Sequence, residues 1–385
     1  MLTHRDVSPP TDHLPPTHRA WVEVDLDAIR RNLLAIRRLL PPSTLLMSVV
    51  KANGYGHGID AVARAALSAG ASWLAVATVG EGMHLRRQGL DAPILVFGPA
   101  ISKEEVEAVV LHRLEPTICT LEQARRFSEA GLGEIQVHVK VDTGMSRLGA
   151  TSDDARGLVQ ALRESRNLTV RGLYSHFATA DSPDPTMAHH QIQRFRELVH
   201  NLESHGARPA LVHLANSAAT LGISGAHLDL VRIGLAQYGI YPAPHLRGTV
   251  ALHPALAVRA RIIFVKTVPD GTGVSYGHTF RTGRPTRLAT VAAGYADGVP
   301  RALSNRIDLL VRGRRVRQVG TITMDQCLID VTDVPETAEG DTVTLLGQDG
   351  PEAIGAGEWA ERLGTIPYEI LTAFSPRLPR IYRHG

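Results

Sequence analysis

The stretch LLMSVVKANGYGHGIDAVARAALSA, residues 45–69, contains the pattern on which the fold depends. Residues 45–50 form an apolar run that ends in two valines, which is typical of a buried strand. A glycine-rich turn follows, and from Ile59 onward the apolar residues recur at helical spacing. This stretch therefore predicts a strand, a turn that begins at Lys51, and a helix over residues 59–69.

The same order of apolar run and helical segment repeats through residues 45–239. The later runs are SWLAVAT, PILVFG, LEPTIC, IQVHVKVDTG, LTVRGLYSHFA, LVHLANS and HLDLVRIG. Eight such units in roughly 200 residues favour the α/β class and a (β/α)8 barrel of the TIM type. A doubly wound sheet is the alternative, but no G-x-G-x-x-G fingerprint opens the series.

The pattern changes near residue 254, which divides the chain into domains. Short β runs separated by Gly, Asp and Pro then predict a mainly β domain over residues 254–385. The barrel is expected over residues 21–253, although its first strand-like segment, 21–29, could join the C-terminal sheet. Residues 1–20 are rich in proline and are expected to form a disordered or extended arm.

The composition excludes several classes of protein. Of the 385 residues 44% are hydrophobic and 21% are charged, and the net charge is only +3. The basic residues are scattered, so we expect no nucleic-acid partner. No apolar run is long enough to span a membrane, and the first twenty residues lack the apolar core of a signal peptide. We therefore expect a cytoplasmic protein.

Cysteine and lysine are both scarce. Cys119 and Cys327 are the only cysteines, which excludes a disulfide framework and a cysteine-rich metal site, and we expect no metal. The 41 basic residues include only four lysines, at positions 51, 103, 140 and 266. Because arginine cannot lose its proton near neutral pH, a position that keeps lysine can require a neutral amine.

Polar residues are expected at the ends of several barrel strands. Lys51 follows the first strand, His176 the sixth, Asn216 and Ser217 the seventh, and Arg232 the eighth. In barrels of this class the active site lies at the C-terminal ends of the strands. A single lysine is more often a surface residue, but a buried one has a lowered pKa and can form an imine with a carbonyl. An imine lysine beside a phosphate site suggests pyridoxal phosphate.

A set of ordered motifs then resembles one family from about Trp21 to Tyr382. The motifs are VVKANGYGHG, HVKVDTGMSRLG, YSHFATAD, HLANSAA, LVRIGLAQYGIY, VSYGHTF, GYADG, TMDQ and IPYEILTAFSPRLPRIY. They resemble the alanine racemases, which are fold-type III pyridoxal-phosphate enzymes. The resemblance implies interconversion of L-alanine and D-alanine, with pyridoxal 5'-phosphate as cofactor and D-alanine supplied for peptidoglycan.

The resemblance also implies the catalytic residues. Lys51 would hold the cofactor as an internal aldimine and act as the base on one face of the substrate. Tyr276, supplied by the partner subunit, would be the base on the opposite face, assisted by His176 and Arg232. Arg232 would also face the pyridine nitrogen and, being only a donor, would keep it unprotonated. Without the resemblance, a salt bridge at a strand end would explain Arg232.

Further roles follow from the same motifs. The residues that would hold the cofactor are Tyr55, Asn216, Ser217, Ile233, Gly234 and Tyr368. Arg147 and the backbone of Met324 from the partner would hold the substrate carboxylate, while Tyr295 and Tyr368 would narrow the entrance. Taken alone, Gly234 would be interpreted as a turn glycine. Sites completed by a second subunit imply a homodimer.

Lys140 matches a lysine that is carbamylated in many racemases. The modification would turn a cation into an anion that orients Arg147. The alternative is an unmodified lysine paired with Asp142 or another acid.

Three other functions are alternatives to alanine racemase. A broad-specificity amino-acid racemase would be expected to have a secretion signal and a disulfide, which the sequence lacks. A barrel decarboxylase would be expected to carry an acid where Arg232 stands. A non-enzymatic pyridoxal-phosphate carrier needs no second base and therefore leaves Tyr276 unexplained.

Overall fold

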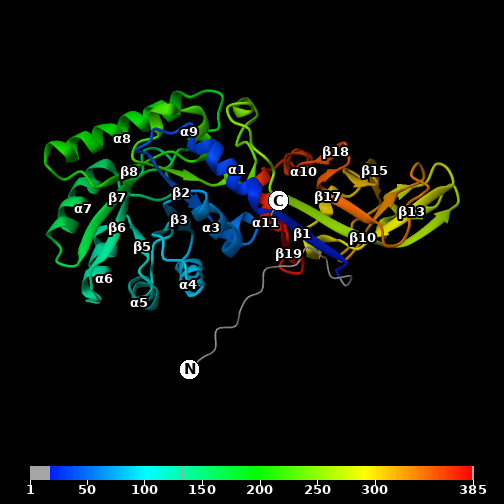
Figure 1. The fold of residues 1–385 in the computed structure, drawn as a ribbon, viewed down its shortest axis with the longest axis horizontal. Helices are drawn as coiled ribbons and strands as arrows, with labels where there is room; N and C mark the ends of the chain where they lie inside the picture. Colours follow the sequence, from blue (N-terminus) through cyan, green and yellow to red (C-terminus); the bar gives the residue numbers. More distant parts are fainter. Residues whose placement is uncertain (1–17, 132, 384–385) are drawn as a thin grey trace. The chain divides into compact units, whose positions relative to one another are not determined.

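The structure is a computed structural model of the chain and describes residues 18–131 and 133–383. They form two compact units (Figure 1), one comprising Ala28–His253 and the other the segment up to Asp27 together with the chain from Pro254 onward. Of the expected Pro-rich arm, residues 1–17 lie outside the described part of the chain.

Parallel strands close into a barrel in the first unit, and this confirms the expected (β/α)8 class. The last strand returns to the first, with Met47 opposite Arg232. Within the described residues the barrel strands are β2 (Leu45–Val49), β3 (Trp73–Val76), β4 (Ile94–Val96), β5 (Glu115–Ile118), β6 (Ile135–Lys140), β7 (Leu168–Tyr174), β8 (Leu211–His213) and β9 (Leu230–Ile233).

Helices follow the barrel strands along the chain. They are α3 (Ile59–Ser68), α4 (Val79–Arg87), α5 (Lys103–Leu111), α6 (Leu121–Glu129), α7 (Ser152–Glu164), α8 (Thr186–Ser204) and α9 (Ser217–Gly222). Before four of them a hydroxyl side chain accepts the backbone N–H three residues later, which satisfies a donor that the helix leaves free. These capping residues are Thr78, Ser102, Thr120 and Thr151. Within the described residues, no helix has the length and apolar character needed to cross a bilayer.

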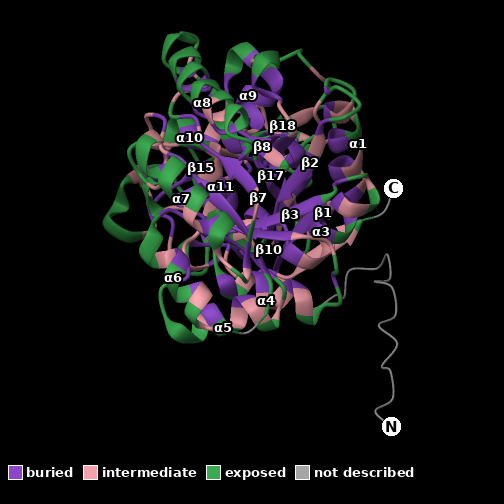
Figure 2. Cartoon of the chain, turned by 90° about the vertical axis from the view of Figure 1, so that its left-hand side faces the viewer, coloured by how far each residue is buried: buried purple, intermediate pink, exposed green. Residues whose placement is uncertain are grey.

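The barrel strands are buried, while the helices bury only one side (Figure 2). Every residue of β3 and of β4 is buried. In α8, Ile192 and Phe195 are buried among exposed neighbours. Strands covered on both faces need apolar residues at nearly every position, which explains the continuous runs in the sequence. A polar side chain inside such a strand therefore requires a partner.

The second unit is built on a mainly antiparallel sheet. Its strand order is β18-β17-β14-β15-β16-β13-β10-β1-β19, with a further pairing between β17 and β10. The strands are β1 (Ala20–Asp25), β10 (Leu256–Val268), β13 (Thr286–Val291), β14 (Asp308–Val311), β15 (Arg314–Val319), β16 (Cys327–Asp330), β17 (Thr342–Asp349), β18 (Glu352–Ile354) and β19 (Arg380–Arg383). A small ribbon of β11 (Gly273–Val274) and β12 (Phe280–Arg281) and the helices α10 (Ala356–Leu363) and α11 (Pro367–Ala373) complete the unit as described.

The first strand is shorter than the expected 21–29. It ends at Asp25 after pairing with β10, and the helix α1 (Leu26–Arg37) begins at the next residue. The sequence explains this boundary, because Ile29, Leu33 and Ile36 recur every three or four residues and all three are buried. The helical period of these residues prevails over the strand-like composition that precedes them.

Candidate active site

Lys51 lies on an unusual turn directly after β2. The turn is drawn as α2 (Lys51–Tyr55), yet Ala52, Asn53 and Tyr55 have φ angles of 52°, 53° and 53°. Left-handed backbone costs a residue with a side chain about 1–2 kcal/mol. The surrounding structure must therefore hold the turn in place.

Two side-chain hydrogen bonds hold this turn. Glu81 accepts the N–H of Ala52 at 2.6 Å, and Asn53 accepts the N–H of Ile59 at 3.0 Å. The second oxygen of Glu81 accepts the N–H of Ala77 at 2.8 Å. One carboxylate thus ties the Lys51 turn to the start of α4.

The surroundings of the Lys51 amine disfavour its charged form. Burial and the nearby Arg147 guanidinium lower its pKa, and Glu81 offsets part of this effect. A neutral amine is both a nucleophile and a base.

Arg232 is buried inside the barrel, where both of its terminal nitrogens lie near acceptors. One terminal nitrogen, Nη2, donates to the carbonyl oxygens of Ser175 and Leu214 at 2.8 and 2.9 Å. The same nitrogen lies 3.2 Å from His176 Nδ1. Burial lowers the pKa of Arg232 to about 10, so the guanidinium still carries its charge at neutral pH.

His176 is held as a neutral imidazole beside this guanidinium. Burial and the charge of Arg232 lower the pKa of His176 well below its ordinary value. Because arginine only donates, Nδ1 of His176 accepts and its proton is on Nε2. His176 therefore presents an N–H donor on the side away from Arg232.

The loop after β9 forms a tight cradle with the loop after β8. The Ser217 hydroxyl accepts the N–H groups of Gly234 and Ala236 at 2.9 and 3.3 Å. A Cβ at Gly234 would lie 2.7 Å from the Tyr55 hydroxyl oxygen. Glycine is required here because Tyr55 approaches the backbone so closely. The buried Ile233 precedes Gly234, and Asn216 caps α9 by accepting the Ala219 N–H.

Positive charge accumulates at this end of the barrel. Burial, followed by Arg232 and Arg147, lowers the pKa of Lys140 to about 8. The Lys140 amine lies 5.4 Å from the centre of the Tyr174 ring. Asp142 instead accepts the N–H groups of Gly144, Met145 and Ser146 through one oxygen. Within the described chain no carboxylate lies in ion-pair range of Lys140, so the cluster favours an anionic ligand.

The remaining expected residues lie in the second unit. Met324 and Tyr295 come from neighbouring loops, since Ala296 N–H donates to Met324 O and Tyr295 N–H to Thr323 O. Tyr276 begins a short 3-10 turn and Tyr368 lies in the first turn of α11. Tyr276 is 73% exposed and Met324 is 53% exposed, so both offer apolar surface to another molecule.

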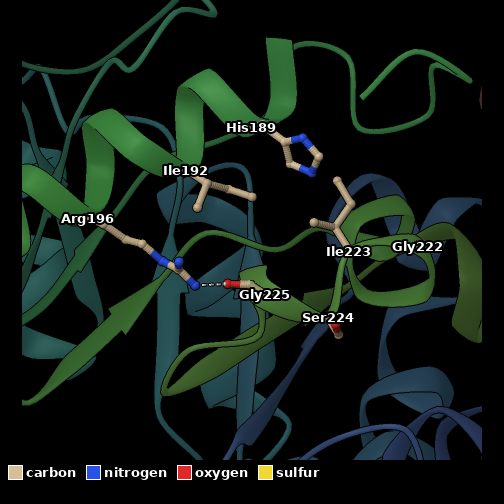
Figure 3. A pocket seen from close by; sticks show the side chains of 7 residues that line it. All are labelled: His189, Ile192, Arg196, Gly222, Ile223, Ser224 and Gly225. Carbon is tan, nitrogen blue, oxygen red and sulfur yellow. Dashed lines mark hydrogen bonds between the residues drawn. The ribbon is translucent and has the colours of Figure 1, made fainter. Parts of the chain in front are cut away.

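A separate surface pocket of about 360 Å³ contains none of the expected site residues (Figure 3). It lies between α8 and the segment after α9, where Arg196 donates to Gly225 O at 2.8 Å.

Other functional candidates escaped the sequence analysis. Glu81 is one, and a second set is buried inside the barrel strands, namely Glu115, His138 and His213. A usable signal existed, because each member of that set is a titratable residue within, or at the end of, a predicted buried strand.

Comparison with known proteins places the chain in a family. The model of the alanine racemase N-terminal domain matches residues 24–242, and that of the alanine racemase C-terminal domain matches residues 255–382. An alanine racemase of Nostoc sp. is 50% identical over 371 residues, which cover 95% of this chain and 96% of that protein. The chain belongs to the alanine racemase family. Another alanine racemase, from Synechocystis sp., is 49% identical over 366 residues, covering 94% of this chain and 98% of that protein.

Solved structures agree with this membership. The crystal structure of alanine racemase from Bacillus anthracis with bound L-Ala-P superposes with a TM-score of 0.91 at 40% identity, covering 97% of both chains. Alanine racemase from D-cycloserine-producing Streptomyces lavendulae gives 0.89 at 39% identity, covering 97% of this chain and 98% of that one. The chain is therefore an enzyme of the amino-acid racemase class.

Proposed function

We propose that this member of the alanine racemase family interconverts L-alanine and D-alanine with pyridoxal 5'-phosphate as its cofactor. The observation that carries the proposal is the pairing of a depressed-pKa lysine with a buried arginine in one barrel. Lys51 supplies an amine whose pKa lies below its ordinary value, while Arg232 supplies donors that cannot accept a proton.

The residues present fit an anionic cofactor. Besides burial, the guanidinium charges of Arg232 and Arg147 lower the pKa of His176, so positive charge is present near this histidine even when Lys51 and Lys140 are neutral. The close approach of Tyr55 to Gly234 brings hydroxyl and backbone N–H groups together beside Ser217, and such groups are the donors that phosphate binding requires. When bound, pyridoxal phosphate supplies an electron sink that acidifies the Cα–H of an amino acid.

Each residue then has a distinct task. Lys51 binds the cofactor covalently and moves the Cα proton on one face. Tyr55, Asn216, Ser217, Ile233, Gly234 and Tyr368 hold the cofactor in position. Arg232 would offer an N–H to the cofactor's ring nitrogen and keep that nitrogen unprotonated, which would limit side reactions. His176 and Arg232 orient the second base.

The second base is Tyr276 of the partner subunit, in a homodimer whose sites are shared. The exposure of Tyr276 and Met324 supports this proposal, because such apolar side chains are covered in a stable assembly. Arg147 and the backbone of Met324 of the partner subunit hold the substrate carboxylate. Tyr295 and Tyr368 narrow the entrance, so that a methyl side chain is preferred over larger ones.

Lys140 is carbamylated in this proposal. Its pKa of about 8 makes a neutral amine accessible near physiological pH, and that amine adds to carbon dioxide with release of one proton. The product would be an anion, which the charges of Arg232 and Arg147 favour, whereas both disfavour a protonated lysine.

The decisive experiment measures D-isomer formation from L-alanine, L-serine and L-lysine by the purified, cofactor-loaded protein. We expect rapid racemisation of alanine and slow conversion of the other two. Comparable rates on all three would favour the broad-specificity racemase, and no D-isomer from any would favour the carrier. The supply of D-alanine to peptidoglycan stays a prediction from the resemblance, and the cytoplasmic location stays a prediction from the composition.

A further inference from the structure

A chain of buried polar groups runs through the barrel from Arg232 to its opposite end. Arg232 Nη1 lies 3.0 Å from His213 Nδ1, and His213 Nε2 lies 3.1 Å from His138 Nδ1. His138 Nε2 lies 2.9 Å from a carboxylate oxygen of Glu115. The four side chains belong to β9, β8, β6 and β5, and all are buried. We call them the relay.

Every hydrogen bond of the relay must point the same way. Arginine only donates, so His213 Nδ1 accepts and the His213 proton is on Nε2. Burial and Arg232 hold the pKa of His213 well below its ordinary value, so this ring is neutral. His213 Nε2–H then donates to His138 Nδ1, and His138 must donate from Nε2. The last group must offer an acceptor, which a carboxylate oxygen of Glu115 provides.

Packing prevents the rings from escaping this arrangement. A Cβ at Gly172 would lie 2.2 Å from His138 Nδ1, so glycine makes room for that ring. His213 stacks on Tyr174 with centroids 4.9 Å apart and planes 9° apart. The rings of Trp73 and His138 pack in a T-shaped arrangement, with their centroids 5.3 Å apart. A ring that turned over would lose its hydrogen bonds in a buried site.

Glu115 ends the relay at the edge of a surface pocket. It opens β5, so it lies at the end of the barrel opposite to Lys51, which follows the end of the parallel strand β2. There it lines a pocket of about 330 Å³ together with Arg86, Arg113 and Arg171. The relay therefore ends in a carboxylate at a pocket that three arginines also line.

We propose that Glu115 is a positioning residue for Arg232. Its carboxylate sets the tautomers of His138 and His213. As a result, Nδ1 of His213 presents a lone pair to Arg232 and not an N–H. The guanidinium is then fixed with Nη2 directed at His176, Ser175 and Leu214. The inference rests on the proposed racemase function, in which Arg232 acts on the cofactor and on the second base.

Two substitutions of Glu115 distinguish its effect on the direction of the hydrogen bonds from its effect on packing. Glu115→Leu removes the acceptor and replaces it with an apolar side chain of similar size. His138 then favours the proton on Nδ1, which forces the His213 proton onto the nitrogen that faces Arg232. Glu115→Gln keeps an acceptor oxygen for His138 and so preserves the direction. Glu134→Leu changes another glutamate of the same pocket that contacts Thr169 and takes no part in the relay.

The first readout is the tautomer state of the histidines, from two-bond proton–nitrogen spectra of holoenzyme labelled with ¹⁵N-histidine. Signals are assigned by comparison with His138→Asn. We expect Nε2–H at both relay histidines in the wild type, in Glu115→Gln and in Glu134→Leu. We expect Nδ1–H at His138 in Glu115→Leu.

The second readout is the kinetics of alanine racemisation. Glu115→Leu should lower kcat about tenfold with little change in KM, because Arg232 is not proposed to bind the carboxylate. Glu115→Gln should restore most of this loss, and Glu134→Leu should match the wild type. Unchanged tautomers and unchanged kcat in Glu115→Leu would overturn the proposal, as would equal losses in the Leu and Gln variants.

The test also covers a variant that does not fold and a wild type that does not racemise alanine. If Glu115→Leu does not fold, His138→Phe breaks the relay with a ring of similar size and should lower kcat in the same way; a wild-type kcat there overturns the proposal. If the wild type fails to racemise alanine, the proposed function has failed. The tautomer spectra still decide whether Glu115 directs the relay.

Discussion

At the scale of single residues, the site depends on amines made less basic by their surroundings. Lys51 and Lys140 are both partly desolvated and both face Arg147. Each effect disfavours the charged amine, and for Lys140 they lower the pKa to about 8. An arginine at either position would stay charged and could neither attack a carbonyl nor take up carbon dioxide.

Lys51→Ala should abolish covalent cofactor binding. The protein should lose its cofactor absorption band, and borohydride reduction followed by peptide mapping should label Lys51 in the wild type only. Lys103→Ala is the matched control, because the side chain of Lys103 is 85% exposed. Labelling of another lysine in the wild type would contradict the assignment.

Unmodified Lys140 should make stability depend on pH in a specific window. Its pKa is about 8 in the folded protein and 10.5 as the ordinary value, so between these values the unfolded chain binds more protons. Folding stability therefore rises as pH increases from about 8 to about 10.5, by on the order of 1–3 kcal/mol. Urea unfolding of apoprotein in bicarbonate-free buffer measures this, with Lys140→Met as reference. Equal pH slopes in both proteins would refute the prediction.

At the scale of elements, strands and helices were predictable because their patterns are local. The apolar run of β4 and the helical spacing of α7 each require only neighbours in sequence. Lys51 and Arg232 were placed at the right strands by counting βα units. The contact between Glu115 and His138 was not predictable, since it depends on the register between β5 and β6. The hydrogen bond from the Ala52 N–H to Glu81 was not predictable either. It requires a left-handed turn, which the backbone preferences of these residues do not favour.

Gly234→Ala should weaken cofactor binding. The new Cβ would meet the Tyr55 hydroxyl oxygen at 2.7 Å, which forces the cradle apart. Fluorescence titration of apoprotein with the cofactor measures the loss. Gly234→Ala combined with Tyr55→Phe should recover part of the affinity, because the closest clashing atom is gone.

A glycine elsewhere provides the control for that experiment. Gly157 lies in α7, and a Cβ added there would meet no atom within 4 Å beyond the adjoining backbone of its own helix. Gly157→Ala should leave cofactor affinity unchanged and stabilise the fold by about 0.5–1 kcal/mol through helix propensity. An equal loss of affinity in both variants would show that the cradle is not specific.

At the scale of the whole molecule, the proposed shared site makes two inactive variants complementary. Lys51→Ala lacks the covalent anchor and Tyr276→Phe lacks the second base. Unfolding and refolding them together should yield heterodimers with one intact site, and racemase activity should reach roughly a quarter of the wild-type level for random pairing and independent sites. Heterodimers demonstrated by differential tagging but without activity would contradict shared sites.

The second unit takes its strands from both ends of the chain. β1 lies between β10 and β19, pairing antiparallel with the former and parallel with the latter. During synthesis β1 leaves the ribosome first, and its two neighbours follow only after the entire barrel segment has emerged. Until then residues 20–25 have no strand to pair with, so their backbone groups and apolar side chains can bind chaperones or other nascent chains. A ribosome that stalls before Arg380 releases a chain in which this edge is still uncovered on one side.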